Sequence, residues 1–142
     1  MKRLRSFAII LLIFNGISAS FGGVGLIASP DGSLMEMPLE WLESTPFNNY
    51  LIPGIILLTV NGILSLVISV LVIIKSRSYE ILIVIQGIIL SGWIIIQMLL
   101  INMFHWLHVL YGLTGLLMIF TGFFIRQRTD FNSMPSGHRS ST

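Results

Sequence analysis

The feature that most constrains this chain is a stretch from Ile81 to Ile125 with no Asp, Glu, Lys or Arg. A single helix of these 45 residues would be about 67 Å long, whereas the hydrocarbon core of a bilayer is only about 30 Å thick. The stretch therefore predicts two membrane-spanning helices, near 81–101 and 108–125. They are joined by a corner at Asn102–His108, where polar side chains collect.

Two further apolar runs, Phe7–Ala28 and Leu51–Ile74, are also long enough to cross a bilayer. Only 10% of the 142 residues are charged, against roughly 25% in soluble domains. We therefore predict an all-α fold, a four-transmembrane-helix bundle that forms one membrane domain over residues 1–128. A short extracytoplasmic cap at 29–50 joins the first two helices, and a disordered cytoplasmic tail occupies 129–142.

The first apolar run could instead be read as a secretory signal with a cleavage site at Ser18-Ala19-Ser20. The run continues to Ala28, however, which gives it 22 residues, whereas the core of a signal peptide has about 7–15. We favour an uncleaved helix.

The basic residues predict the orientation of the bundle. All eight lie before the first run, between the second and third, or after the fourth, whereas the cap contains four acids and no base. Because cytoplasmic loops are enriched in Lys and Arg, we expect both termini in the cytoplasm of the cell and residues 29–50 outside its cytoplasmic membrane.

The cap has the pattern of an ordered segment rather than a plain linker. Ser29-Pro30-Asp31-Gly32-Ser33 is typical of a turn, and Leu39–Glu43 after Pro38 is typical of a short amphipathic helix. A surface for a partner is predicted from the acidic and aromatic residues of the cap: Asp31, Glu36, Trp41, Phe47 and Tyr50.

The predicted spans contain amides and hydroxyls but no Asp, Glu, Lys or Arg, which argues against a proton-coupled carrier. Such groups either hold helices together by hydrogen bonds or line a polar pathway, and we favour the first. Trp93, Gln97 and Asn102 nevertheless mark a possible pocket near the cap. Small residues four apart, such as Gly16 and Ser20, allow close helix packing within one chain or in a homo-oligomer or another membrane partner.

His105 and His108 are three positions apart and could share a metal ion with the cap acids. We favour the simpler interpretation, two interfacial histidines beside Trp106. The sequence contains no nucleophile–base pair, phosphate loop or dinucleotide fingerprint. It therefore favours a non-enzymatic protein without a cofactor, with the lipid bilayer as its main partner and no nucleic acid.

Several segments resemble a group of small, uncharacterised bacterial four-helix integral membrane proteins. The resembling residues are Ser29–Ser33, Met37–Leu39, Thr45–Phe47, Tyr50–Gly54, Asn61-Gly62, Trp93 and Gln97. The resemblance implies four helices in a bacterial cytoplasmic membrane and no particular activity. A weaker likeness to the DoxX-like proteins concerns size and helix number alone.

Three hypotheses for function follow. The first is a structural or accessory membrane protein that binds a partner through its cap. The second is a binder or carrier of a small apolar or neutral molecule within the bundle, and the third is a metal site at His105 and His108.

Overall fold

The computed structural model describes residues 2–35, 39–43, 45–101 and 106–133, and all secondary structure within these ranges is helical. The membrane-length helices are α1 (Lys2–Ala28), a second helix built from α2 (Leu51–Ile56), η3 (Leu57–Ile63) and α3 (Leu64–Ile73), then α4 (Tyr79–Ile101) and α5 (Trp106–Ser133). All four are long and apolar enough to cross a membrane. The predicted fold class, an all-α bundle of four transmembrane helices, is confirmed, and it is typical of a multi-pass membrane protein.

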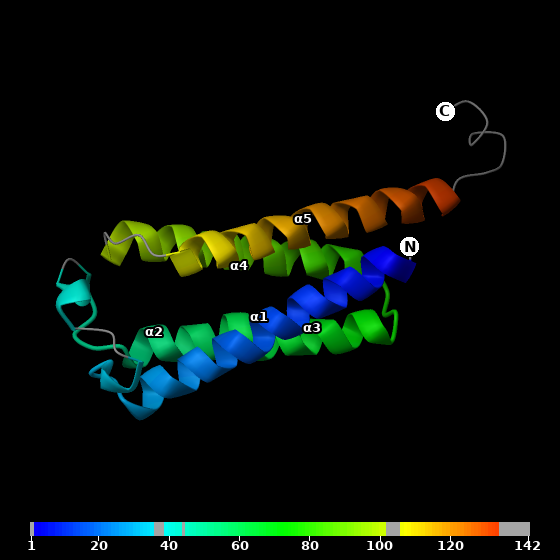
Figure 1. Cartoon of the computed structure of the whole chain (residues 1–142). Coiled ribbons are helices and arrows are strands. Elements are labelled where there is room, and N and C mark those ends of the chain that lie inside the picture. Colours follow the sequence, from blue (N-terminus) through cyan, green and yellow to red (C-terminus); the bar gives the residue numbers. More distant parts are fainter. Residues whose placement is uncertain (1, 36–38, 44, 102–105, 134–142) are drawn as a thin grey trace.

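The bundle consists of two antiparallel helix pairs (Figure 1). One pair is α1 with the α2–η3–α3 helix, and the other is α4 with α5, and each pair is in contact along its length. Gly87 permits this contact, because a Cβ there would lie only 2.7 Å from the carbonyl oxygen of Gly115. The two pairs are joined by contacts of α1 with α5, including a stacked pair of rings, Phe14 and Tyr111, with centroids 5.8 Å apart.

Buried apolar side chains form two separate clusters. The larger cluster draws on all four membrane-length helices and includes Leu12, Val72, Ile83 and Met118. The smaller one lies at the cap and consists of Leu26, Leu42 and Tyr50, with Phe47 and Leu57 packed against it. The cap is therefore attached to the bundle by its own small core.

The charged groups of the described residues separate between the two ends of the bundle. The N-terminus of α1, the α3–α4 turn and the end of α5 lie at one end, which we call the terminal end, and the cap lies at the other (Figure 1). All basic side chains of the described residues belong to the terminal end, together with Glu80 and Asp130. The acids Asp31, Glu40 and Glu43 belong to the cap.

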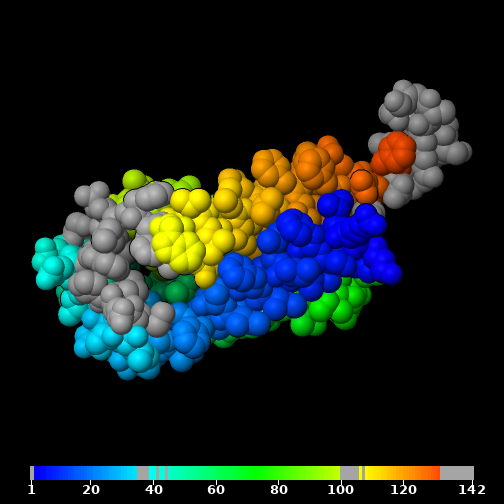
Figure 2. Space-filling model, viewed as in Figure 1, coloured from blue at the N-terminus to red at the C-terminus, as the bar shows by residue number. Residues whose placement is uncertain are grey.

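The sides of the bundle are strongly apolar. Figure 2 shows α1 and α5 lying along one face, with the cap across one end. Large apolar side chains project outward from every membrane-length helix, among them Phe21, Val70, Leu99 and Phe120. Such a surface matches a hydrocarbon solvent rather than water.

Helix α5 extends into the segment 129–142, which the sequence predicted to be disordered. Residues 129–133 continue the helix to Ser133, which corrects the prediction for this part of the tail. A pair four positions apart supports the extension, because Arg126 Nε lies 3.4 Å from Asp130 Oδ2. Residues 134–142 lie outside the described residues.

Candidate functional site: an apolar cavity beneath the cap

A tight turn begins the cap and ties its two ends together. The carboxylate of Asp31 accepts hydrogen bonds from the backbone N–H (3.0 Å) and the hydroxyl (2.8 Å) of Ser33. Gly32 adopts a φ of 80°, which a glycine reaches without a steric penalty. The N–H of Tyr50 then donates to the carbonyl oxygen of Pro30 at 2.8 Å. This bond brings the last cap residue beside the first turn.

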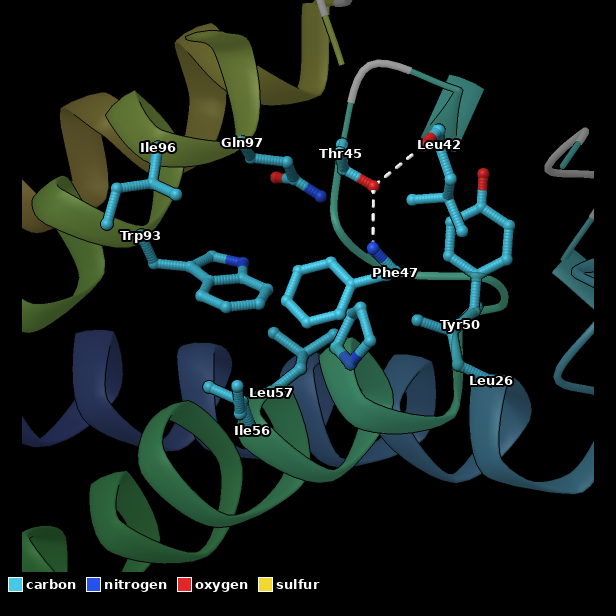
Figure 3. Close-up of a pocket in the computed structure, with 11 residues that line it drawn as sticks. Leu26, Leu42, Thr45, Phe47, Tyr50, Ile56, Leu57, Trp93, Ile96 and Gln97 are labelled. Carbon is cyan, nitrogen blue, oxygen red and sulfur yellow. Dashed lines mark hydrogen bonds between the residues drawn. The ribbon is translucent and has the colours of Figure 1, made fainter. Parts of the chain in front are cut away.

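Thr45 fixes the position of Phe47 within the cap. Its hydroxyl donates to the carbonyl oxygen of Leu42 at 2.8 Å and accepts a bond from the N–H of Phe47 at 3.2 Å (Figure 3). The threonine hydroxyl is thus used inside the cap, and the ring of Phe47 is directed toward α4.

Tyr50 is buried, with only 1% of its surface exposed, and packs against Leu26 and Leu42. Burial raises the pKa of its phenol above the usual value of 10.0. The sequence suggested Tyr50 as part of an exposed partner surface. The structure places it inside, because the bond to Pro30 folds the end of the cap back over α1.

A cavity of about 310 Å³ lies between this small core and α4 (Figure 3). It is lined by Leu26, Leu42, Thr45, Phe47, Tyr50, Pro53, Ile56, Leu57, Trp93, Ile96 and Gln97. Trp93 and Gln97, one helical turn apart on α4, face Phe47 and Thr45 across the space (Figure 3). The cavity therefore joins the cap, the α2–η3 helix and α4 in one site.

The lining of the cavity is almost entirely apolar. Apolar cavities exclude water and bind apolar molecules, and one of about 150 Å³ accepts a benzene molecule. The cavity here is roughly twice as large, at the lower end of the range of about 300–1,000 Å³ for ligand pockets. Its chemistry favours one apolar group of moderate size and offers no site for an ion.

The structure brings together only some of the residues that the sequence singled out. Trp93 and Gln97 line the cavity with Phe47 and Tyr50, whereas the exposed Asp31 lies in the turn away from it. The described residues do not include Asn102, His105, Glu36 or the side chain of Trp41, which the sequence also singled out.

The metal hypothesis concerns two histidines, of which the structure describes only His108, on α5. Within the described ranges, no three metal-ligating side chains gather closely enough to hold an ion. The pairing of His105 with His108 stays a prediction.

An ion pair with a buried carboxylate, at the terminal end, was not predicted from the sequence. Glu80, in the first turn of α4, is only 4% exposed, and its Oε1 lies 3.2 Å from Arg126 Nη1 of α5. The signal was present in the sequence, because Glu80 and Arg126 immediately flank the uncharged stretch at 81–125. If that stretch forms a hairpin, its two flanking residues must meet.

Comparisons with known proteins give no relative: no family model, no curated protein and no solved structure matches this chain.

Proposed function

We propose that this multi-pass membrane protein binds a hydrocarbon chain of a membrane lipid in the cavity beneath its cap, without catalysing a reaction. The observation that supports the proposal most is the cavity itself, which is apolar, of ligand size and closed on one side by an ordered segment. A hydrogen-bonded cap with its own small core is more than is needed to connect two helices.

The surroundings of the cavity favour a ligand that arrives from the bilayer. Ile96 lines the cavity and is also 52% exposed, so it lies where the cavity meets the apolar side of the bundle. Ile52 and Ile55 of α2, next to the lining residues Pro53 and Ile56, are also exposed. A molecule entering there would pass from lipid into the cavity without crossing water.

The driving force for such binding would be packing. Lipid hydrocarbon is as apolar as the cavity, so transfer from water contributes little. An unfilled space, in contrast, deprives its lining atoms of dispersion contacts. The rings of Trp93 and Phe47 offer large surfaces against which a chain regains these contacts.

We further propose that the terminal end faces the cytoplasm, which places the cavity in the outer leaflet. The confinement of the basic side chains of the described residues to the terminal end supports this orientation. The location in a bacterial cytoplasmic membrane is inferred from the sequence alone.

Photolabelling with a phospholipid that carries a diazirine in its acyl chain tests the proposal. The protein is reconstituted in vesicles, irradiated and digested, and the labelled residues are identified by mass spectrometry. We expect labelling of Trp93, Gln97 or Leu57 that saturates and is reduced by excess unlabelled lipid. Labelling of outward residues such as Leu99 should not saturate.

A matched pair of variants on α4 separates the cavity from the lipid-facing surface. Ile96→Trp would block the cavity and should abolish the saturable labelling. Ile95→Trp, at the adjacent exposed position, should leave it unchanged. Equal, non-saturable labelling in both variants and in the native protein would show that the cavity holds no lipid chain.

An accessory role through the cap is the second candidate function. Leu34 and Leu39 are exposed on the cap beside the acids Asp31 and Glu40, a combination that suits a basic and partly apolar protein surface. Cross-linking in intact cells of the native protein and of a Leu34→Glu, Leu39→Glu double variant tests this role. The variant should lose a discrete cross-linked complex, and an unchanged pattern would exclude a cap-mediated complex.

A further inference from the structure

Three buried amide side chains meet at the π-helical turn in the middle of the second span. Asn15 of α1 donates from Nδ2 to the backbone carbonyl of Asn61 at 3.3 Å. Gln86 of α4 donates from Nε2 to the carbonyl of the preceding residue, Val60, also at 3.3 Å. Asn15, Asn61 and Gln86 are all fully buried. The neighbouring helices α1 and α4 thus each direct an amide to a turn that carries a third amide, that of Asn61.

The π-helical geometry explains why backbone carbonyls are available there. In η3 the spacing of the backbone hydrogen bonds changes. The N–H of Leu64 donates to the carbonyl oxygen of Thr59, five positions back, instead of to that of the residue four positions back. Such a shift leaves carbonyl groups near the turn without their usual N–H partner, and inside a membrane these must be satisfied by neighbouring groups. The amides of Asn15 and Gln86 supply these bonds.

The amides themselves remain incompletely bonded. Among the described residues, no protein partner reaches Asn15 Oδ1, Gln86 Oε1, or either Oδ1 or Nδ2 of Asn61. These four atoms lie inside apolar spans, where an unbonded polar atom is strongly unfavourable. They comprise three acceptors and one donor.

The direct hydrogen bonds of the cluster are longer than usual. The bonds of Asn15 Nδ2 to the Asn61 carbonyl and to Ser65 Oγ measure 3.3 and 3.4 Å, longer than the usual 2.9–3.0 Å. The same two helices form a short bond of 2.8 Å one turn away, from Ser65 Oγ to the Leu12 carbonyl. The bonds of Asn15 are therefore long although the two helices approach closely one turn away.

We propose that at least one water molecule is bound among Asn15, Asn61 and Gln86. A water donates two hydrogen bonds and accepts others, which matches a set of three acceptors and one donor, and buried waters typically make about three bonds. A metal cation fits poorly. The nearest acid along α4, Glu80, is paired with Arg126, and an uncompensated charge in a membrane interior is costly.

Nuclear magnetic resonance of the native protein in deuterated detergent tests this site. Val60–Asn61 is the only Val–Asn pair in the sequence, so ¹³C-Val and ¹⁵N-Asn labelling identifies the backbone N–H of Asn61, from which its side-chain amide is assigned by intraresidue cross-peaks. We expect a nuclear Overhauser cross-peak between water and the Asn61 side-chain amide, with the sign of a long-lived contact. Absence of this cross-peak would overturn the proposal, and the measurement needs no substitution.

The thermal midpoint of the variant Asn61→Leu is a second test, because it should change in opposite directions with and without a bound water. If a water bridges the amides, an apolar side chain of similar size removes one of its partners, leaves Asn15 Oδ1 and Gln86 Oε1 less well satisfied, and lowers the thermal midpoint in detergent. If no water is bound, the substitution removes an unbonded amide and raises the midpoint, which would contradict the proposal.

Discussion

At the scale of single residues, the position of a charged side chain at a membrane boundary determines its contribution to stability. Glu80 is buried against Arg126, whereas Asp130, the other partner of Arg126, is 57% exposed. We expect Glu80→Gln to lower the free energy of unfolding in detergent by about 1 kcal/mol, discounted because Arg126 itself is 44% exposed. Asp130→Asn is the matched control and should have a clearly smaller effect. Equal losses in the two variants would show that burial of Glu80 is unimportant.

A second carboxylate, Asp31, makes the cap sensitive to acid. The N–H and hydroxyl of Ser33 donate to it and lower its pKa below the usual 3.8. Ionised Asp31 therefore stabilises the turn above pH 3.8, and this contribution is lost as the pH falls through the lowered pKa of the folded state. Titration of the Asp31 carboxyl carbon by nuclear magnetic resonance should give a midpoint below 3.8. A midpoint at or above that value would contradict the bonds to Ser33.

Single residues also mark the limit of prediction from the sequence. The burial of Tyr50 depends on the bond between its N–H and Pro30, so a residue that the sequence predicted to form a partner surface becomes part of a small core. The sequence marked Gln97 and Trp93 as part of a possible pocket. They lie on one face of a helix that has few polar residues, and this face does line the cavity. Their partners Leu42 and Leu57 carry no distinguishing signal, since they are leucines among many.

At the scale of elements, the close packing of α4 on α5 depends on glycine. A Cβ at Gly87 would lie 2.7 Å from the Gly115 carbonyl and 2.9 Å from the backbone nitrogen of Ile119, so one helix would have to move. We expect Gly87→Ala to reduce stability by about 1–3 kcal/mol, as overpacking usually does. Gly92 on the same helix has nothing within 4 Å of the corresponding position. Gly92→Ala should therefore be neutral or stabilising by less than about 1 kcal/mol.

Reversible unfolding of the two glycine variants in mixed micelles measures both effects. Because each variant adds one methyl group to the same helix, differences in helix propensity cancel in the comparison. A similar loss in both, or none in either, would show that α4 and α5 are not packed as closely as the structure has them.

The helices themselves were largely predictable, whereas their irregularities were not. Uncharged runs and the flanking basic residues located the spans, since a chain without formal charges cannot remain in water over such lengths. The π-helical turn at η3 has no signature in the hydropathy pattern. It depends on hydrogen bonds that its backbone carbonyl groups accept from the side-chain amides of Asn15 and Gln86, which belong to other helices.

At the scale of the whole molecule, the separation of charge predicts how the bundle is inserted. The chain has no cysteine, so single cysteines can be introduced without a background. Asn48→Cys in the cap should react with an impermeant maleimide from outside intact cells, and Gln127→Cys in α5 should react only after lysis. Both positions are exposed. The reverse pattern would place the cap in the cytoplasm.

The proposed function depends on what occupies the cavity beneath the cap. Its size, its apolar lining and its contact with the lipid-facing side of α4 all favour a chain drawn from the bilayer. The most direct measurement is a high-resolution structure of the full chain in lipid nanodiscs. We predict elongated density between Leu57, Trp93 and Gln97 that continues past Ile96 into the surrounding lipid. A cavity filled by the protein's own side chains, or one that is empty in lipid, would contradict the proposed function.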